Sequence, residues 1–513
     1  MFRLDGGIGA PSVRAVDATQ DDGRVSSEPE QEPGSSGGDP RRPAVHTFDD
    51  ELARLDAVAT IDALDSGQLS VREVVAAAIE RARRVDPQIG AVMFERYGEA
   101  LASLPARRAR RGSFEGLPTF IKDMVPVAGL PCTWGAAALE GAPPQKRTRG
   151  VARDMEAMGM SLVGTSTMPE WGFVPSTEFP ERAPTVNPWN PARTIGGSSG
   201  GAAALVAAGV VPVAHAVDGG GSTRIPAACG GLVGLKPSLG RLRRHSDERN
   251  LPLSVSVDGV VTRTVRDTAR FYAEMERVFR PRSMPPMGEV TGPPSRRLRV
   301  GVLGAIPGLA DIDEPTRSTL QSTADLLAEL GHHVEETKPP VEPEQFRDDF
   351  IFYYRFLVFM ATNTAPIVHG SHYDRTRLTK FSQGMAASFR AEPSRIVGVS
   401  RRLRRVRARM AAATRDFDVM LSPTVSTVPP LLGHLGANVD FEPLLDRIAA
   451  WMPYTPLANA GGTPAINVPM GVDEGAHLPV GMMLSGDFGS DALLVQLALE
   501  LEDARPSDLA RIG

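Results

Sequence analysis

A glycine- and serine-rich stretch from Gly196 to Ser222 constrains this chain more than any other part of its sequence. It begins with GGSSGG, passes through the small-residue run AAALVAAG and the apolar segment VVPVAHAV, and ends with DGGGS. Ser198 and Ser222 therefore lie in two glycine-rich loops, 24 positions apart. Glycine lets a backbone reach positive φ and lets a ligand approach its N–H groups closely. Each loop offers a serine hydroxyl beside backbone donors, which acyl transfer needs for its nucleophile and its oxyanion.

Two other interpretations of the first loop compete with this one. Glycine–serine runs are commonly flexible linkers, but apolar residues flank this run on both sides. A phosphate-binding loop needs a lysine after its last glycine, and Ala202 stands there instead. We therefore expect a structured loop that carries chemistry.

Segments of strand length alternate with helical patterns along the chain. VVPVAHAV is nearly all apolar and rich in β-branched residues, which predicts a central buried strand. Further strands are expected at 119–121, 298–303, 332–336, 459–472 and 478–486, with helices at 151–160, 314–330 and 490–503. This alternation predicts an α/β fold, with one large mixed, twisted β-sheet covered by helices on both faces.

The first ordered elements are predicted to be helices that pack without carrying chemistry. DDELARLDAVATIDALDSG has helical spacing and stops at Gly67. Ser70 and Glu73 form a capping box, which opens a helix that we expect to run through about Val85, before Pro87.

The domain organisation follows from shifts in composition. Residues 1–45 are rich in Gly, Pro, Ser and acidic residues, and this predicts a disordered N-terminal tail. Residues 46–513 are predicted to form a single domain. Within it, 341–455 is helical and is expected to be a variable region that lines a substrate pocket. The Arg-rich segment 401–410 predicts an amphipathic helix with an exposed basic face.

Charge, hydropathy and cysteine content exclude several classes of protein. A net charge of −5 with mixed signs argues against a general nucleic-acid binder. No apolar run reaches the roughly 18 residues that a membrane helix needs, and the N-terminus lacks the apolar core of a signal peptide. Cys132 and Cys229 are too few for a disulfide framework. We expect a cytoplasmic location, with no nucleic-acid or membrane partner.

A Ser–His–Asp hydrolase is one candidate chemistry. GSSGG at 197–201 matches the G-x-S-x-G elbow, with Ser199 as nucleophile. That elbow needs a preceding strand, whereas a proline-rich coil precedes this one. None of the nine histidines stands in a motif typical of a base, and His215, within the apolar segment, is predicted to be a core histidine. No histidine pair has a familiar metal-ligand spacing, so no metal is expected.

Lys122 is the other candidate base. It ends a short apolar strand beside Phe120, Ile121 and Met124. Such neighbours favour burial of the amine, and burial lowers the pKa of a lysine. An ordinary lysine has a pKa of about 10.4, and a general base at neutral pH needs roughly 7–8.

Three blocks of sequence carry a resemblance to a known family: GLPTFIKD (116–123), GGSSGG (196–201), and DGGGSTRIPA (218–227) followed by GLKPS (234–238). Lys122 precedes Ser198 by 76 positions. With these blocks and distances the sequence resembles the amidase signature family, over roughly residues 55–505. Weaker agreement includes N-x-x-G-x-P-A at 459–465. The three blocks together are highly specific, although none would be alone.

The resemblance implies a role for each matching residue. Ser222 would be the nucleophile that forms an acyl-enzyme, and Lys122 would be the final base. Ser198, whose peptide bond would be cis, would pass the proton between them. The backbone N–H groups of Gly219, Gly220 and Gly221 would form the oxyanion hole. Asp218 and Arg224 are expected to brace this loop, with Ser199 in support. No cofactor or metal is implied.

The function that follows is hydrolysis of the C–N bond of a small-molecule carboxylic amide, linear or cyclic, through an acyl-serine. The DGGGS loop resembles that of broad amidases and of hydrolases of the 6-aminohexanoate cyclic dimer. Thr165 and Met483 depart from the commoner family pattern, which bears on substrate preference.

Several alternatives stay open at this point. One is a subunit of a tRNA-dependent amidotransferase, which shares the relay but passes ammonia to a partner. The second is the Ser–His–Asp hydrolase that uses Ser199. The third is an inactive binding protein, against which the intact Lys122, Ser198 and Ser222 argue. A homodimer is one of the assemblies open to the chain.

Overall fold

The computed structural model describes residues 43–104, 112–244, 251–309 and 311–506. Nearly all of the predicted tail lies outside the described residues. Its last part does not: Val45 is buried, and its N–H donates to the carbonyl of Pro188 at 2.8 Å. The packed chain therefore begins slightly before residue 46, where the domain was predicted to start.

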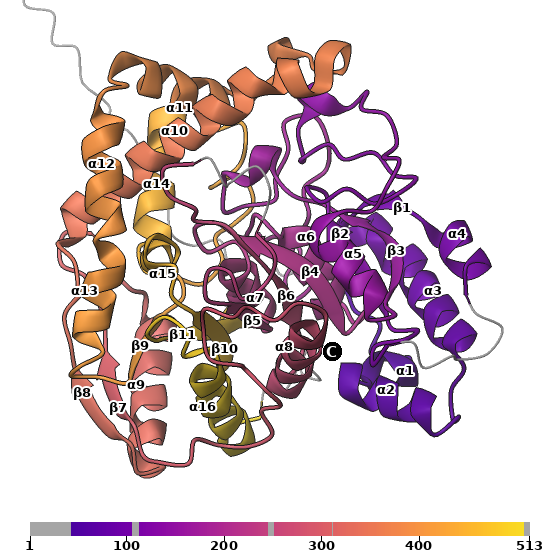
Figure 1. The fold of residues 1–513 in the computed structure, drawn as a ribbon, viewed down its shortest axis with the longest axis horizontal. Helices are drawn as coiled ribbons and strands as arrows, with labels where there is room; N and C mark the ends of the chain where they lie inside the picture. The colour runs from indigo at the N-terminus through magenta and orange to yellow at the C-terminus, as the bar shows by residue number, and fades with distance from the viewer. Residues whose placement is uncertain (1–42, 105–111, 245–250, 310, 507–513) are drawn as a thin grey trace, which may run out of the picture. The chain divides into compact units, whose positions relative to one another are not determined.

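The strands of the described residues form two β-sheets (Figure 1). The smaller sheet has the order β1–β3–β2, with bounds Val92–Glu95, Ser161–Ser166 and Pro118–Lys122. The larger has the order β4–β6–β5–β10–β11–β9–β7–β8. Its bounds in that order are Val213–Asp218, Val257–Thr262, Val233–Lys236, Ala465–Asp473, Leu478–Ser485, Val419–Pro423, Arg299–Val302 and His333–Glu336.

The larger sheet is mixed, because β7 pairs in parallel with β8 and β9 while its other pairs are antiparallel. This confirms the predicted α/β fold. The sequence did not predict the second sheet, in which the strand of Lys122 lies: β2 pairs in parallel with β3 and not with the large sheet.

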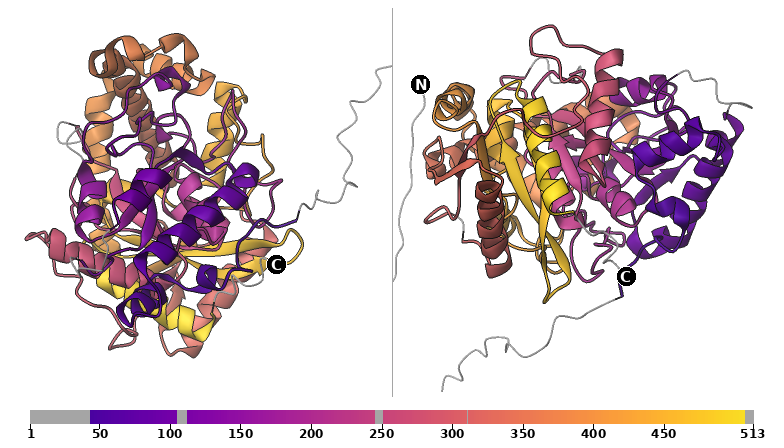
Figure 2. Two further views of the ribbon diagram at one scale, coloured as in Figure 1. Left: turned by 90° about the vertical axis from the view of Figure 1, so that its right-hand side faces the viewer. Right: turned by 90° about the horizontal axis from the view of Figure 1, so that it is seen from below.

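Helices cover both faces of the large sheet because successive side chains along a strand point to opposite faces, and each face has its own apolar core. Along β4, Val213 packs into one core and Ala214 and Ala216 into the other. α6 (Gly200–Ala207) and α7 (Arg224–Gly230) belong to the alanine side. On the opposite side pack α8 (Val265–Val278), α9 (Glu314–Glu329) and α16 (Asp491–Ala504). Figure 2 shows α8 and α16 side by side.

The N-terminal helices follow the sequence signals, with two differences. The predicted first helix is broken into α1 (Glu51–Arg54) and α2 (Ala57–Asp65), because the Asp56 side chain caps the start of α2. α3 (Val71–Ile89) has the predicted capping box. It continues past Pro87 and ends before Gly90, whose left-handed backbone caps it and whose N–H donates to the carbonyl of Asp86. The next two α-helices along the chain are α4 (Tyr97–Ala102) and α5 (Gly150–Ala157).

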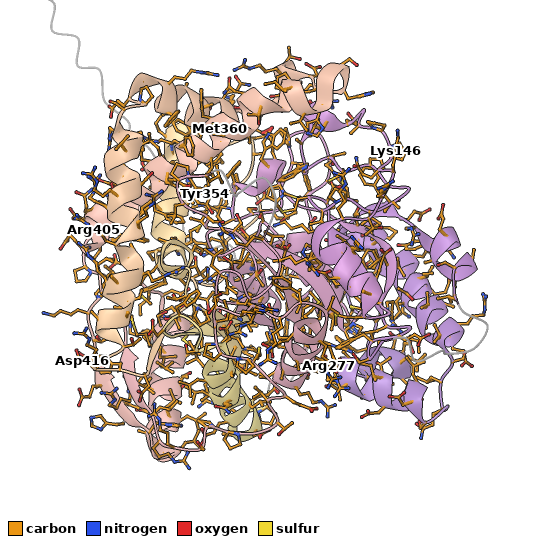
Figure 3. All side chains as sticks on the ribbon, in the orientation of Figure 1. Lys146, Arg277, Tyr354, Met360, Arg405 and Asp416 are labelled. Atoms are coloured by element: carbon orange, nitrogen blue, oxygen red, sulfur yellow. The ribbon has the colours of Figure 1, made fainter. Side chains whose placement is uncertain are left out.

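The segment 341–455 is mainly helical, with bounds α10 Pro343–His369, α11 Lys380–Ala391, α12 Arg395–Arg404, α13 Val406–Ala413 and α14 Phe441–Trp451. The predicted Arg-rich helix is two helices that meet at Arg405, which lies at the outer edge (Figure 3). Its basic face is partly engaged: Arg402 pairs with Asp349, and Arg407 donates to the carbonyl of Gly461.

The C-terminal hairpin is the predicted pair, because β10 and β11 pair in antiparallel fashion. The expected strand at 459–472 starts later, since α15 (Pro456–Gly461) occupies its first residues. Among the helices of the described chain, none is long and apolar enough to cross a membrane.

Candidate active site

Lys122 ends β2 in the interior, where its side chain faces the first glycine–serine loop. The residue is 1% exposed. Its Nζ donates to Ser198 Oγ at 2.7 Å and to Ser199 Oγ at 2.9 Å, and lies 3.4 Å from the carbonyl oxygen of Val217. The structure therefore brings together the amine and both serines of GGSSGG.

The environment of Lys122 favours a neutral amine. Burial lowers its pKa from 10.5 to about 7, while the charges of Asp218 and Asp258 act in the opposite direction. Burial has the larger effect, because the ammonium form loses more hydration free energy on burial than it gains from attraction to the two nearby carboxylates. A substantial fraction of the amine is unprotonated at neutral pH, so it can accept a proton.

The loop that carries Ser198 is tied to β4 and to the second loop. The Gly197–Ser198 peptide bond is cis. Ser199 is fully buried; its Oγ accepts the N–H of Val217 at 3.2 Å and lies 3.3 Å from the Val217 carbonyl. The Ser199 N–H donates to the carbonyl of Ser222 at 3.2 Å. Ser199 thus connects the two glycine-rich loops.

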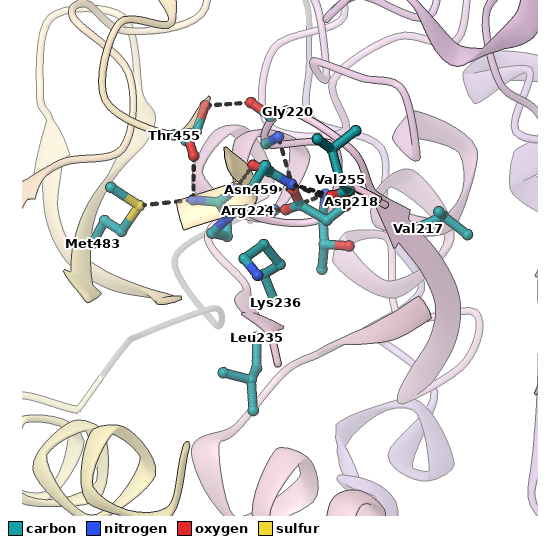
Figure 4. A network of polar contacts seen from close by, with 12 residues as sticks. Val217, Asp218, Gly220, Arg224, Leu235, Lys236, Val255, Thr455, Asn459 and Met483 are labelled. Carbon is teal, nitrogen blue, oxygen red and sulfur yellow. Dashed lines mark hydrogen bonds and ion pairs between the residues drawn. The ribbon is translucent and has the colours of Figure 1, made fainter. Parts of the chain in front are cut away.

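The second loop is built around the buried carboxylate of Asp218 (Figure 4). Arg224 donates to it from Nε and Nη2, each at 2.9 Å, and the N–H of Gly221 donates at 2.8 Å. Burial alone would raise the pKa of Asp218, but Arg224, and after it Asn459, holds it below its ordinary value. Asp218 is a charged anchor that the loop wraps around.

Two residues from α15 and its cap complete this anchor and were not predicted from the sequence. Asn459 donates to the carbonyl oxygen of Asp218 at 3.0 Å and to its carboxylate at 2.9 Å. The Thr455 hydroxyl donates to the carbonyl of Gly220 at 2.7 Å. The weak motif at 459–465 was the available signal for Asn459; Thr455 had none.

The N–H groups of the loop divide into two sets. Gly221 was expected in the oxyanion hole, but its N–H is directed at Asp218. Its φ is +134°, and a Cβ at this position would collide with Thr455 Oγ1, so the loop requires glycine there. Within the described residues, the N–H groups of Gly219, Gly220 and Ser222 make no hydrogen bond. Those three donors are available to an oxyanion.

A cavity opens over this loop, with about 800 Å³ of empty space including its mouth. Ser222 and Gly220 form part of its wall, and Ser222 is half-buried, whereas Ser198 is 2% exposed. Most of the wall is apolar and comes from 341–455, including Phe346, Phe350, Phe381, Met385, Leu445 and Ile448.

Tyr354 of α10 lines the cavity close to Gly220 of the loop. A Cβ on Gly220 would lie 2.6 Å from its hydroxyl, so a side chain at 220 would collide with the ring. In the part of the chain that the structure describes, no cluster of three or more His, Cys, Asp or Glu side chains could hold a metal ion.

Comparison with known proteins places this arrangement in a family. The family model described as Amidase matches residues 73–495. The chain belongs to the amidase signature family. It is an amidohydrolase, as its sequence resemblance implied.

The relatives of this amidase are similar over nearly their whole length. A Mycobacterium tuberculosis protein named as an amidase, AmiC, is 43% identical over 463 residues, which cover 90% of this chain and 97% of AmiC. The solved structure of a 6-aminohexanoate cyclic dimer hydrolase with substrate has a TM-score of 0.79 at 27% identity, covering 90% of this chain and all of that one. A bacterial aryl acylamidase has the same TM-score and identity, covering 90% and 98%.

Proposed function

We propose that this amidase hydrolyses carboxylic amides through an acyl-enzyme on Ser222, with Ser198 and Lys122 as the proton relay. One observation carries the proposal: a fully buried lysine with a pKa of about 7 lies 2.7 Å from Ser198, while Ser222 opens into the cavity. Ser222 is the hydroxyl that lines the cavity, and the proposal has Lys122 act on it through Ser198, which Lys122 contacts.

The reaction begins when Ser222 Oγ attacks the substrate carbonyl and its proton passes to Ser198, whose own proton passes to Lys122. The N–H groups of Gly219, Gly220 and Ser222 hold the oxyanion; one such donor is typically worth about 2.7–4 kcal/mol. The tetrahedral intermediate then expels the amine, which takes a proton back through Ser198. Water attacks the acyl-serine by the same relay, and this releases the acid.

The cavity supports an apolar substrate. Its walls carry aromatic and aliphatic side chains, and Arg347 and Tyr354 are among its few polar residues. Apolar walls stabilise bound apolar groups by about 25 cal/mol per Å² of buried surface. We therefore assign the substrate class as aryl or long-chain aliphatic amides, linear or cyclic. The two solved relatives act on a cyclic dimer and on aryl acylamides by name, which agrees with this class.

The alternatives fit the site less well. The glutaminase reaction of an amidotransferase subunit requires a polar side chain to be bound, and an apolar wall leaves such a group without partners. Ser199 as nucleophile is disfavoured because it is fully buried and bonded to Lys122 and Val217.

The test compares wild type, Ser222→Ala and Ser199→Ala with a panel of anilides, hexanamide, cyclic amides, acetamide and glutamine. Amine or ammonia release is measured beside intact mass. We expect turnover of the apolar amides and an acyl adduct in wild type, both lost in Ser222→Ala. Equal turnover in Ser222→Ala would refute the nucleophile assignment. Preferred turnover of glutamine, with a copurifying partner, would favour the amidotransferase.

A further inference from the structure

His215 and Asp258 form a buried pair behind the relay lysine that the proposed reaction does not use. His215 lies on β4 and Asp258 on β6, at diagonal positions of the antiparallel pair, where His215 is opposite Val260 and Val217 is opposite Asp258. Their side chains are 0% and 2% exposed. His215 Nε2 and Asp258 Oδ1 are 3.0 Å apart.

The pair lies at the junction of the two sheets. β2 is the edge of the small sheet and β4 the edge of the large one, and the two strands pack together without forming a backbone ladder (Figure 1). Side chains bridge the junction instead. Thr119 Oγ1 donates to the carbonyl of Val213 at 3.0 Å, and the backbone N–H of Lys122 donates to His215 Nδ1 at 3.2 Å. The imidazole nitrogen thus accepts the Lys122 N–H, which in a regular sheet would donate to a backbone carbonyl of the neighbouring strand.

This contact determines the tautomer of the ring. A backbone N–H can only donate, so Nδ1 is the acceptor, and the ring proton is on Nε2, where it donates to Asp258. An imidazole protonated on both nitrogens has no acceptor left for Lys122. The carboxylate therefore holds His215 in the form that receives the Lys122 N–H.

We propose that His215 and Asp258 are positioning residues for the relay: His215 fixes the backbone of Lys122 at the end of β2, and Asp258 fixes His215. The inference rests on the proposed function, because it assumes that Lys122 is the base. Its consequence is geometric. Lys122 Nζ contacts Ser198 and Ser199 at 2.7 and 2.9 Å only while its main chain stays at the junction.

Asp258 also acts on the lysine through its charge. The titratable groups against Lys122 are His215 and Asp218 on β4, Asp258 on β6, and the adjacent Asp123, whose carboxylate accepts from Thr133. Of these, Asp218 and then Asp258 favour the ammonium form of Lys122. Removal of the Asp258 charge should therefore lower the pKa of Lys122 further.

The experiment measures how fast a fluorophosphonate modifies Ser222, so no natural substrate is needed. The Ser222 Oγ–P bond forms, the P–F bond breaks, fluoride leaves, and the serine proton passes to the relay. Labelling is followed by intact mass in the full chain between pH 5 and 9, and Ser222→Ala serves as the blank. Rates are expressed per folded molecule, with folding checked by circular dichroism and thermal unfolding.

Two substitutions separate the two contacts of His215. His215→Asn retains an acceptor at the Nδ1 position, whereas His215→Gln retains only the donor toward Asp258. A displacement of about 1 Å in a catalytic group can cost 10²-fold, so we expect labelling to fall tenfold or more in His215→Gln and less than about threefold in His215→Asn. Thr119→Val, which removes the other bond across the junction, is the matched control and should keep the wild-type rate.

The second readout is the pH profile. Asp258→Asn keeps an acceptor for His215 but removes the charge, so the acid limb of labelling should move to lower pH by roughly half a unit or more. This profile also decides the matter if His215→Gln does not fold. Wild-type rates in His215→Gln, or an unmoved acid limb in Asp258→Asn, would overturn the inference alone. Absence of labelling in wild type would overturn the assignment of Ser222 instead.

Discussion

Replacement of Lys122 by methionine should change how the stability of this amidase depends on pH. A lysine with a folded pKa of about 7 and an unfolded value of 10.5 binds more protons in the unfolded chain than in the folded one. Such a group destabilises the fold below its unfolded pKa, and the destabilisation is relieved as the pH rises. Methionine has a similar length and no titration, so it removes this dependence.

The magnitude follows from the two pKa values of Lys122. At pH 7 the folded amine is half protonated, whereas the unfolded amine is fully protonated. The free energy of unfolding then rises with pH at up to about 1.4 kcal/mol per unit, which amounts to roughly 2 kcal/mol between pH 7 and 9. Lys236 has a similarly lowered pKa of about 7, but it is present in both proteins and cancels in their difference.

The assay is urea unfolding of wild type and Lys122→Met at pH 7, 8 and 9, followed by circular dichroism. We expect the free energy of unfolding of wild type to gain about 2 kcal/mol more than that of the variant over this range. In the same range, Ser222 labelling in wild type should show an acid limb with a midpoint near pH 7, and Lys122→Met should not label. Parallel pH dependences, within about 0.3 kcal/mol, would show that the pKa of Lys122 is not lowered.

Three further predictions concern the loop, the cavity and the first capping box. Gly221→Ala should destabilise the fold by roughly 2–5 kcal/mol in urea unfolding, because it adds backbone strain and a clash with Thr455; unchanged stability would contradict this. Ile448→Asn places an amide in the apolar wall, so kcat/KM for anilides should fall about tenfold while that for acetamide stays nearly constant; an equal loss for both would argue against this wall as the binding site. Ser70→Ala should cost about 1 kcal/mol of stability and leave activity unchanged, because the cap lies at the start of α3; a loss of activity would reveal a coupling that the structure does not show.

Local patterns in the sequence predicted much of the fold. The capping box at Ser70 and Glu73 is present as expected, and β10 and β11 pair as predicted. These features depend on residues close together in the chain or on continuous apolar runs of strand length. The break in the first helix at Asp56 and the late start of β10 were missed, because caps and tertiary packing decide boundaries that periodicity leaves undefined.

The sequence by itself determined the family and the residues of the proposed relay. These residues could be recognised because they stand in short blocks at defined spacings within this one sequence. The backbone of a glycine-rich loop approaches other groups closely, so few residues other than glycine fit there. The membership in the amidase signature family is confirmed by the family match over 73–495. The roles of Lys122, Ser198 and Ser222 remain predictions that the geometry supports.

Only the tertiary structure decided what surrounds those residues. His215 contacts Lys122 across 93 positions, and Asn459 contacts Asp218 across 241. The cavity wall joins Gly172 to Pro456. Contacts between such distant residues leave no periodic or local pattern in a single sequence. A core histidine and a tyrosine on a long helix therefore carried no signal of their place at the site, and the distant asparagine had only the weak motif at 459–465. Their positions follow from how two sheet edges and a set of helices pack together.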